Sequence, residues 1–332
     1  MVAYFKEIWP IATAMVVICL VVARIVYTQY QIPLEQVIIA EAQQPVFALI
    51  YIADANGYFK DVGLDVTYRK FTVGKDALTD TLEGKSDLAL AYEAPVVMRA
   101  SEGHDIGIIG SLHYSTMDTG ILARKDLGIN SAADLRGKRV GVQKGTNAEY
   151  FLESYLANED VDISDVHIID VKVEDAEQAY LDRTIDALAI WNLPQYLLNE
   201  NIRLASNVFY SNAYTEMSVI VGTKSYITSH HDAVSKLLAA IVRAEDYYNS
   251  HQIQSIQIVA NRLPSKSVSV AEMVLRAITV KLQLDNLLVT ILNQEAEWYR
   301  NKKVYKNDPP DFRTVIMKDY LFRIRPTSVT IF

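Results

Sequence analysis

Cysteine is almost absent from this sequence, and basic residues form no cluster. The 332 residues include one cysteine, Cys19, and 32 lysine and arginine residues against 40 aspartate and glutamate residues, so the formal net charge is −8. A single cysteine excludes an intrachain disulfide. The acidic balance, together with the lack of any zinc-finger, homeodomain or RNA-binding signature, argues against nucleic acid as a partner.

Motifs that carry catalysis or bind metal ions are also missing. The sequence has no G-x-S-x-G elbow, no Walker A loop and no complete G-x-G-x-x-G, and none of its six histidines has the H-E-x-x-H spacing. We therefore predict a protein that is not an enzyme, with no cofactor and no metal site.

Charged residues are missing from one long apolar run near the amino terminus. The run extends from Ile8 to Tyr27 and holds no charged residue before Arg24. About 20 helical residues cross a hydrocarbon core of about 30 Å, so the run predicts a transmembrane helix or a signal peptide. We favour an uncleaved membrane anchor within residues 1–30, because no clean small-x-small cleavage site follows the run, and we expect a linker over 31–35.

From residue 36 onward, apolar strands alternate with helical segments. This β-α rhythm predicts an α/β fold with parallel strands covered by helices on both faces. The strands are expected at 37–40, 64–71, 87–91, 106–111, 120–123, 139–142, 166–171, 187–190 and 217–221. The helices are expected at 45–56, 75–83, 94–101, 132–135, 147–157, 174–181, 231–249, 253–262, 270–278 and 286–300.

The stretch from Gly137 to Asn147 reads as a buried strand that passes through a glycine turn into a helix. Gly145 permits the tight turn, and Thr146 with Glu149 has the spacing of a capping box. Such a turn aims backbone N–H groups into a cleft, where a small ligand binds. The alternative is an ordinary strand-turn-helix junction of an α/β protein.

Five passages resemble, in the same order, the motifs of one protein family. They are the stretches 55–66 (ANGYFKDVGLDV), 84–89 (GKSDLA), 131–145 (SAADLRGKRVGVQKG), 184–194 (TIDALAIWNLP) and 325–331 (RPTSVTI). The chain from about residue 36 resembles substrate-binding proteins of ABC importers in the nitrate, sulfonate, taurine and thiamine-precursor group. These are type II periplasmic binding proteins.

The resemblance implies a two-lobed fold that closes on a ligand between its lobes. Lobe 1 would hold residues 36–118, lobe 2 residues 119–217, and residues 218–332 would return to lobe 1 and form a helical tail, with hinges near 118–120 and 216–218. It further implies an extracytoplasmic domain, here on a single-pass cell-membrane anchor, whose partners are a small ligand and an ABC permease with its ATPase. A membrane-anchored sensory module is the rival hypothesis.

Several candidate ligand-binding residues follow strands and open helices. Gln43, Gln44 and Pro45 follow the first strand, and Tyr92 and Glu93 follow the strand at 87–91. Glu93 either pairs with a cationic ligand or only stabilises its own helix start through the helix dipole. Alternatively, the two glutamines are only surface amides, and Pro45 is only a proline at a helix start.

The second half of the chain supplies further candidates in the same kind of position. Thr146 and Asn147 open a helix, and Trp191 with Asn192 follows a strand, where the indole either stacks on a ligand or fills the core. The candidates at the hinges are Tyr114, Asp118 and Glu216. Because these acidic side chains make the cleft negative, we predict an amine or aminopyrimidine as ligand, with sulfonate or nitrate as the alternative.

Overall fold

The structure is a computed structural model that describes residues 15, 17–20, 34–212, 214–305 and 308–331. The chain divides into two units, Met1–Glu35 and Gln36–Phe332, and the second holds the α/β fold. Among the described residues, no helix combines the length and apolar character that a membrane crossing needs. Most of the predicted anchor and linker lies outside these residues, so both stay predictions.

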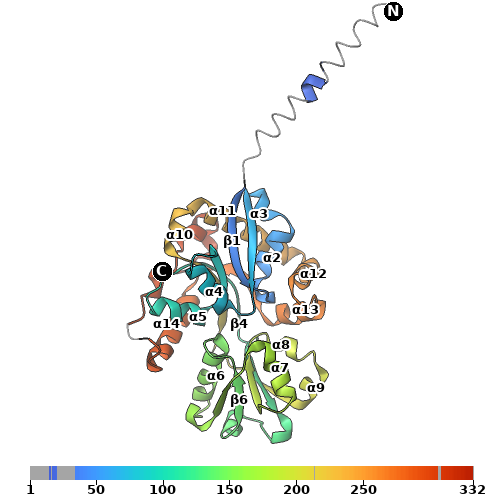
Figure 1. Cartoon of the computed structure of the whole chain (residues 1–332), viewed down its shortest axis with the longest axis vertical. Helices are drawn as coiled ribbons and strands as arrows, with labels where there is room; N and C mark the ends of the chain where they lie inside the picture. The colour runs from blue at the N-terminus through green and yellow to red at the C-terminus, as the bar shows by residue number, and fades with distance from the viewer. Residues whose placement is uncertain (1–14, 16, 21–33, 213, 306–307, 332) are drawn as a thin grey trace, which may run out of the picture. The chain divides into compact units, whose positions relative to one another are not determined.

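A mixed six-stranded sheet with its covering helices forms the part of the molecule that we call lobe 1 (Figure 1). Strand β10 runs antiparallel to both β3 and β4, whereas β1 and β3 are parallel. Every residue of β3 and of β10 is buried, so the centre of this sheet is core on both faces. In spatial order the strands are β11 (Thr279–Gln283), β4 (Gly107–Ser115), β10 (Glu216–Gly222), β3 (Leu88–Tyr92), β1 (Glu35–Ala42) and β2 (Leu64–Phe71).

The helices of lobe 1 come from both ends of the chain. Helix α11 packs on α2, and α14 packs on α5, so the carboxyl-terminal helices cover elements of the first hundred residues. The bounds are η1 (Pro45–Phe47), α2 (Ala48–Ala55), α3 (Tyr58–Asp61), α4 (Gly74–Leu82), α5 (Glu93–Ser101), α10 (Lys224–Ser229), α11 (His231–Ser250), α12 (Gln252–Arg262), α13 (Val268–Ala277), α14 (Asn286–Asn301), α15 (Phe312–Val315), α16 (Asp319–Ile324) and η5 (Pro326–Ser328).

A five-stranded sheet and its helices form lobe 2, drawn in green and yellow in Figure 1. Strand β6 is parallel to β7 and β8, while β5 is antiparallel to β8 and β9. The spatial order is β7 (His167–Asp170), β6 (Arg139–Val142), β8 (Ala187–Ile190), β5 (Gly120–Arg124) and β9 (Ser206–Phe209). The helices are η2 (Lys125–Leu127), η3 (Ala132–Leu135), α6 (Asn147–Asn158), η4 (Ile163–Asp165), α7 (Val173–Leu181), α8 (Leu193–Tyr196) and α9 (Glu200–Ala205).

The chain passes between the two sheets twice, from β4 to β5 and from β9 to β10. The first crossing carries Asp118 and Thr119, and the second ends at Glu216; all three are buried. The predicted hinges lie beside these crossings, whereas the predicted lobe bounds stay an expectation.

Three expectations about the strands were wrong. The sheets are mixed rather than parallel, because the crossings return the chain antiparallel to its neighbours. Residues 279–283 form β11 next to β4, whereas no strand was expected between the helices predicted at 270–278 and 286–300. Strand β9 was not predicted at all. Both missed strands are short segments of only four or five residues, so periodicity along the sequence is a weak signal for them.

Candidate functional site

Strand ends and helix starts from both lobes line two adjoining cavities, which we call the cleft. The smaller cavity has a volume of about 20 Å³ and the larger about 290 Å³, and both include Gln44 and Trp191. The smaller is lined by Gln44, Val73, Gly74, Lys75, Tyr92, Pro95, Thr146, Asn147 and Trp191. Because the carboxyl ends of parallel strands are the usual place for ligands in α/β sheets, the cleft is the candidate binding site.

The volume of the smaller cavity bears on how a ligand enters. About 20 Å³ admits roughly one water molecule, so a larger ligand needs the larger cavity or a separation of the lobes. At the rim, Lys75 of lobe 1 donates a hydrogen bond from Nζ to the carbonyl oxygen of Lys144 in lobe 2, at 3.0 Å. This contact joins the lobes across the cleft.

The glycine turn before α6 differs from its prediction. Thr146 occupies the N-cap position, but its Oγ1 donates to the carbonyl oxygen of Gln143 at 2.7 Å and does not cap the helix. The Glu149 carboxylate accepts from the N–H of Gly145 at 2.7 Å and pairs with Lys302 at 2.8 Å. The expected capping box is therefore wrong, because Glu149 binds the turn itself and a cation of lobe 1.

Asn147 connects the cleft to both crossings between the lobes. Its side chain is buried, and Nδ2 donates to Thr119 Oγ1 and to Glu216 Oε2, each at 3.1 Å. Thr119 in turn donates its backbone N–H to Glu216 Oε1 at 3.1 Å and its hydroxyl to Oε2. The amide nitrogen of Asn147 is thus used inside the protein, behind the cavity wall.

Asp118 lies next to Glu216, and we call these two residues the crossing pair. Asp118 accepts from Tyr92 Oη and from the backbone N–H of Asn192, each at 3.2 Å. Burial raises the pKa of Asp118 to about 6, and burial together with the Asp118 charge raises the pKa of Glu216 well above its usual value. Two buried carboxyls in contact share a proton rather than both ionising.

Glu93 belongs to a second buried carboxyl pair, which we call the α14 pair. Its Oε1 accepts from Tyr214 Oη at 2.5 Å, its Oε2 from the N–H of Met217 at 3.1 Å, and its carboxyl faces that of Glu295 on α14. Burial raises the pKa of Glu93 to about 7; burial and the Glu93 charge raise that of Glu295 well above its usual value.

The structure brings most of the predicted site residues to the cleft. The cavity walls include Gln43, Gln44, Pro45, Tyr92, Thr146, Asn147, Trp191 and Asn192. Asp118 and Glu216 lie behind this wall, bonded to Tyr92 and Asn147. Glu93 does not line either cavity, and Tyr114 is half-buried in β4, opposite Met217 and Thr279.

Sequence reasoning missed part of the wall. The missed residues are Thr72, Val73, Gly74, Lys75, Pro95, Val173, Glu174, Gln195, Tyr196, Leu263, Pro264, Ser265 and Val270. Residues 72–75 directly follow the predicted strand 64–71, so the strand-end rule that found Gln44 would also have found them. Residues 263–265 join two tail helices, and no local signal places that turn at the cleft.

The wall combines aromatic surface with carbonyl oxygens that accept hydrogen bonds. Trp191 is 4% exposed and lies against both cavities. Gln44 Oε1 and Asn192 Oδ1 are buried and have no hydrogen-bond partner among the described residues. Lys75 and Glu174 are the charged residues in the described cavity walls. A polar, donor-bearing ligand that stacks on an indole fits this arrangement.

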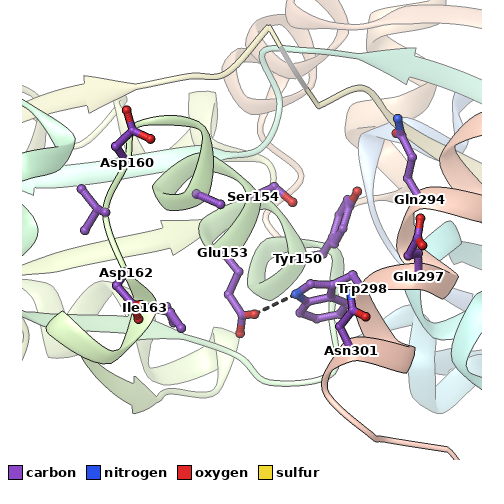
Figure 2. Close-up of a pocket in the computed structure, with 12 residues that line it drawn as sticks. Tyr150, Glu153, Ser154, Asp160, Asp162, Ile163, Gln294, Glu297, Trp298 and Asn301 are labelled. Carbon is purple, nitrogen blue, oxygen red and sulfur yellow. Dashed lines mark hydrogen bonds between the residues drawn. The ribbon is translucent and has the colours of Figure 1, made fainter.

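A separate groove of about 770 Å³ lies between α6 of lobe 2 and α14 of lobe 1 (Figure 2). In Figure 2 the Trp298 indole faces the Glu153 carboxylate, and its Nε1 donates to Oε2 at 2.7 Å. Lys302 also pairs with Glu153 at 2.7 Å. The groove contains none of the predicted site residues, and the contacts within it hold the two lobes together.

Solved structures share this two-sheet fold. The Escherichia coli periplasmic aliphatic sulphonate binding protein aligns with a TM-score of 0.73 at 19% identity, over 87% of this chain and 99% of that one. The fold is therefore that of a periplasmic binding protein, as predicted.

Sequence comparison defines the family. The model of the NMT1/THI5-like family matches residues 44–255, and the chain belongs to this family, which confirms the resemblance. A provisionally named binding protein of Brucella abortus is 27% identical over 216 residues, 64% of this chain and 66% of that protein. A provisionally named aliphatic sulfonates-binding protein of Bacillus subtilis is 25% identical over 61% of this chain and 62% of that protein. The match thus spans just under two thirds of these relatives.

Proposed function

We propose that this protein captures a small polar solute by closing its lobes and delivers it to an ABC permease with its ATPase. The observation that carries the proposal is the cleft itself, where strand ends and helix starts of both lobes meet around Trp191. The mechanism is closure rather than chemistry, and no catalytic role is assigned to any residue. The binding domain would work outside the cytoplasm, held at the membrane by the amino-terminal segment.

The proposed ligand is nitrogenous, an amine or an aminopyrimidine. Buried acceptor oxygens of Gln44 and Asn192 have no partner in the described chain, and a ligand with N–H groups would satisfy them. The described walls of these two cavities contain no arginine, the residue best suited to bidentate binding of sulfonate-like anions. Trp191 would stack on a planar ring, and a cationic ligand would gain up to about 2 kcal/mol from it when desolvated.

A sulfonate-type or nitrate anion is the second candidate. Lys75 and the starts of α4 and α6 lie at the cleft, and helix starts favour negative charge. The likeness to the sulfonate-binding relative supports the same choice. A sensory module would use the same cleft without transport; a gene neighbourhood with a permease and an ATPase would favour transport, and signalling genes would favour sensing.

Thermal unfolding of the full chain against amines, aminopyrimidines, sulfonates and nitrate tests the proposal. A ligand at about 100 times its dissociation constant stabilises the folded state by about 2.7 kcal/mol, which moves the unfolding midpoint by several degrees. Trp191→Ala should abolish the shift, while Tyr247→Ala, an aromatic change on α11 away from the cavity walls, should keep it. A shift with anions alone would reject the nitrogenous ligand, and no shift with any class would count against solute capture.

A further inference from the structure

Hydrogen bonds behind the cleft wall run in one direction, from lining groups to the crossing pair. Asn147 donates both to Glu216 and to Thr119, whose hydroxyl donates to the same Glu216 oxygen. Tyr92 donates its hydroxyl proton to Asp118. The lining groups that touch the crossing pair therefore use their donors inside the protein.

Asn147 and Tyr92 keep only hydrogen-bond acceptors for a ligand in the cleft. A primary amide has one donor end and one acceptor end, so Asn147 is left with Oδ1 on the side away from Glu216. A phenol has one proton, so Tyr92 is left with oxygen lone pairs. Both residues line the smaller cavity, next to Gln44, whose buried Oε1 has no partner in the described chain.

From these contacts we infer that Asp118 and Glu216 are positioning residues, because they decide whether Tyr92 and Asn147 present hydrogen-bond donors or acceptors to a ligand. We call this property the hydrogen-bond polarity of the cleft. By binding the donors of Tyr92 and Asn147, the two acidic residues leave acceptors at these two positions of the wall, so the part of a ligand that contacts them must donate. The inference rests on the proposed function and deepens it, because it restricts the solute to donor-rich compounds such as amidines, amines and aminopyrimidines.

Glu216→Gln reverses this polarity with almost no change in shape. The new side-chain amide keeps one oxygen for the N–H of Thr119 and turns its NH₂ toward Asn147, whose amide must then flip and point its own NH₂ at the cleft. Glu295→Gln is the matched control, because it also replaces a fully buried glutamate but touches neither cavity.

The first measurement needs no ligand. Side-chain NH₂ protons of Asn147, assigned by their loss in Asn147→Asp, are followed by NMR in the full chain. We expect hydrogen exchange at least about tenfold faster in Glu216→Gln than in the wild type and in Glu295→Gln, because a tenfold change corresponds to the net free energy of about one hydrogen bond. Equal exchange in all three proteins would overturn the inference.

The second measurement compares benzamidine, which only donates, with benzoate, which only accepts. The wild type and Glu295→Gln should prefer benzamidine, and Glu216→Gln should shift the ratio of dissociation constants at least about tenfold toward benzoate. A wild-type preference for benzoate, or an unchanged ratio, would overturn the inference while leaving solute capture intact. If neither probe binds the wild type, solute capture of this ligand class is in doubt, and the exchange rates alone decide the inference.

Asp118→Ala covers the case in which Glu216→Gln does not fold. It removes the oxygen that accepts from Tyr92, so the hydroxyl of Tyr92 is then free to donate into the cleft. The same shift of the benzamidine-to-benzoate ratio is expected, and an unchanged ratio would again overturn the inference.

Discussion

The crossing pair and the α14 pair are equally buried, but they differ in the hydrogen-bond donors that reach them. Glu216, of the crossing pair, accepts from a backbone N–H, a hydroxyl and an amide, and Asp118 accepts from a phenol and another backbone N–H. In the α14 pair, donors reach Glu93, but no amide, hydroxyl or cationic donor in the described chain reaches Glu295. Burial raises the pKa of all four carboxyls.

This difference shows that a raised pKa does not by itself identify a binding residue. Three residues that donate to the crossing pair, Tyr92, Asn147 and Asn192, also line the cleft. A change in the charge or geometry of the pair therefore acts on the ligand site. The α14 pair joins α5 to α14 away from the cavities, where its effect is on stability and lobe packing. Four experiments test whether the two pairs differ in this way.

The largest effect is expected from Glu216→Leu. The change removes the acceptor of the N–H of Thr119, of its hydroxyl and of one N–H of Asn147, and each buried group left without an acceptor costs about 1–3 kcal/mol. The free energy of unfolding, measured by chemical denaturation, should fall by about 3 kcal/mol or more. A loss below about 1 kcal/mol would mean that the donors find other partners and that the crossing pair is not a hydrogen-bond centre.

The dependence of stability on pH should come next in size. Because the pKa of Glu93 is raised from 4.5 to about 7 in the folded state, its contribution is fully present below pH 4.5 and is lost as the pH rises through about 7. The contribution of Asp118 to stability is also lost as the pH rises, and this loss is complete near pH 6. The unfolding midpoint should therefore drop by several degrees between pH 5 and pH 8; a midpoint that rises over this range would contradict the shifts.

Glu295→Gln should stabilise the protein at pH 8. At pH 8 the new amide can donate to the Glu93 carboxylate without holding a titratable proton, whereas the Glu295 carboxyl must stay protonated to do so, and this difference should be worth about 1–2 kcal/mol. The same variant should flatten the decline in stability between pH 5 and pH 8. Destabilisation by Glu295→Gln would show that the carboxyl of Glu295 has a role that the described contacts do not explain.

The smallest effect is expected from Tyr214→Phe, which removes one hydrogen bond to Glu93. The cost should be about 1 kcal/mol. Since that bond lowers the pKa of Glu93, its loss should also raise this pKa and extend the loss of stability to higher pH. Denaturation curves at pH 5 and pH 8 measure both effects. An equal loss of stability at the two pH values would show that Tyr214 does not affect the titration of Glu93.

Local sequence signals predicted much of the fold and many of the cleft residues. Gln44, Asn147 and Trp191 were found because each follows a strand and precedes a helix, a position that the chain order alone specifies. Strand β11, which joins the tail to the first sheet, was missed, because five residues between two helices carry too little periodicity.

The hydrogen-bond partners of the buried acidic residues could not be predicted from the order of residues in the chain. Tyr92 and Glu93 are adjacent, yet Tyr92 reaches Asp118 behind the cleft wall while Glu93 reaches Tyr214 and Glu295. A sequence pattern reports that two carboxylates lie near a helix start or a hinge; it does not report which side each one faces.

The alternation of strands and helices, the family and the strand ends at the cleft could be predicted from the chain order, because each depends on residues close together in the chain. Which acids pair and which donors they bind depends on the folded arrangement. Those bonds join residues 26 to 124 positions apart, such as Tyr92 with Asp118 and Glu93 with Met217. Buried hydrogen bonds of this kind depend on the packing of two lobes, and chain order does not encode that packing locally.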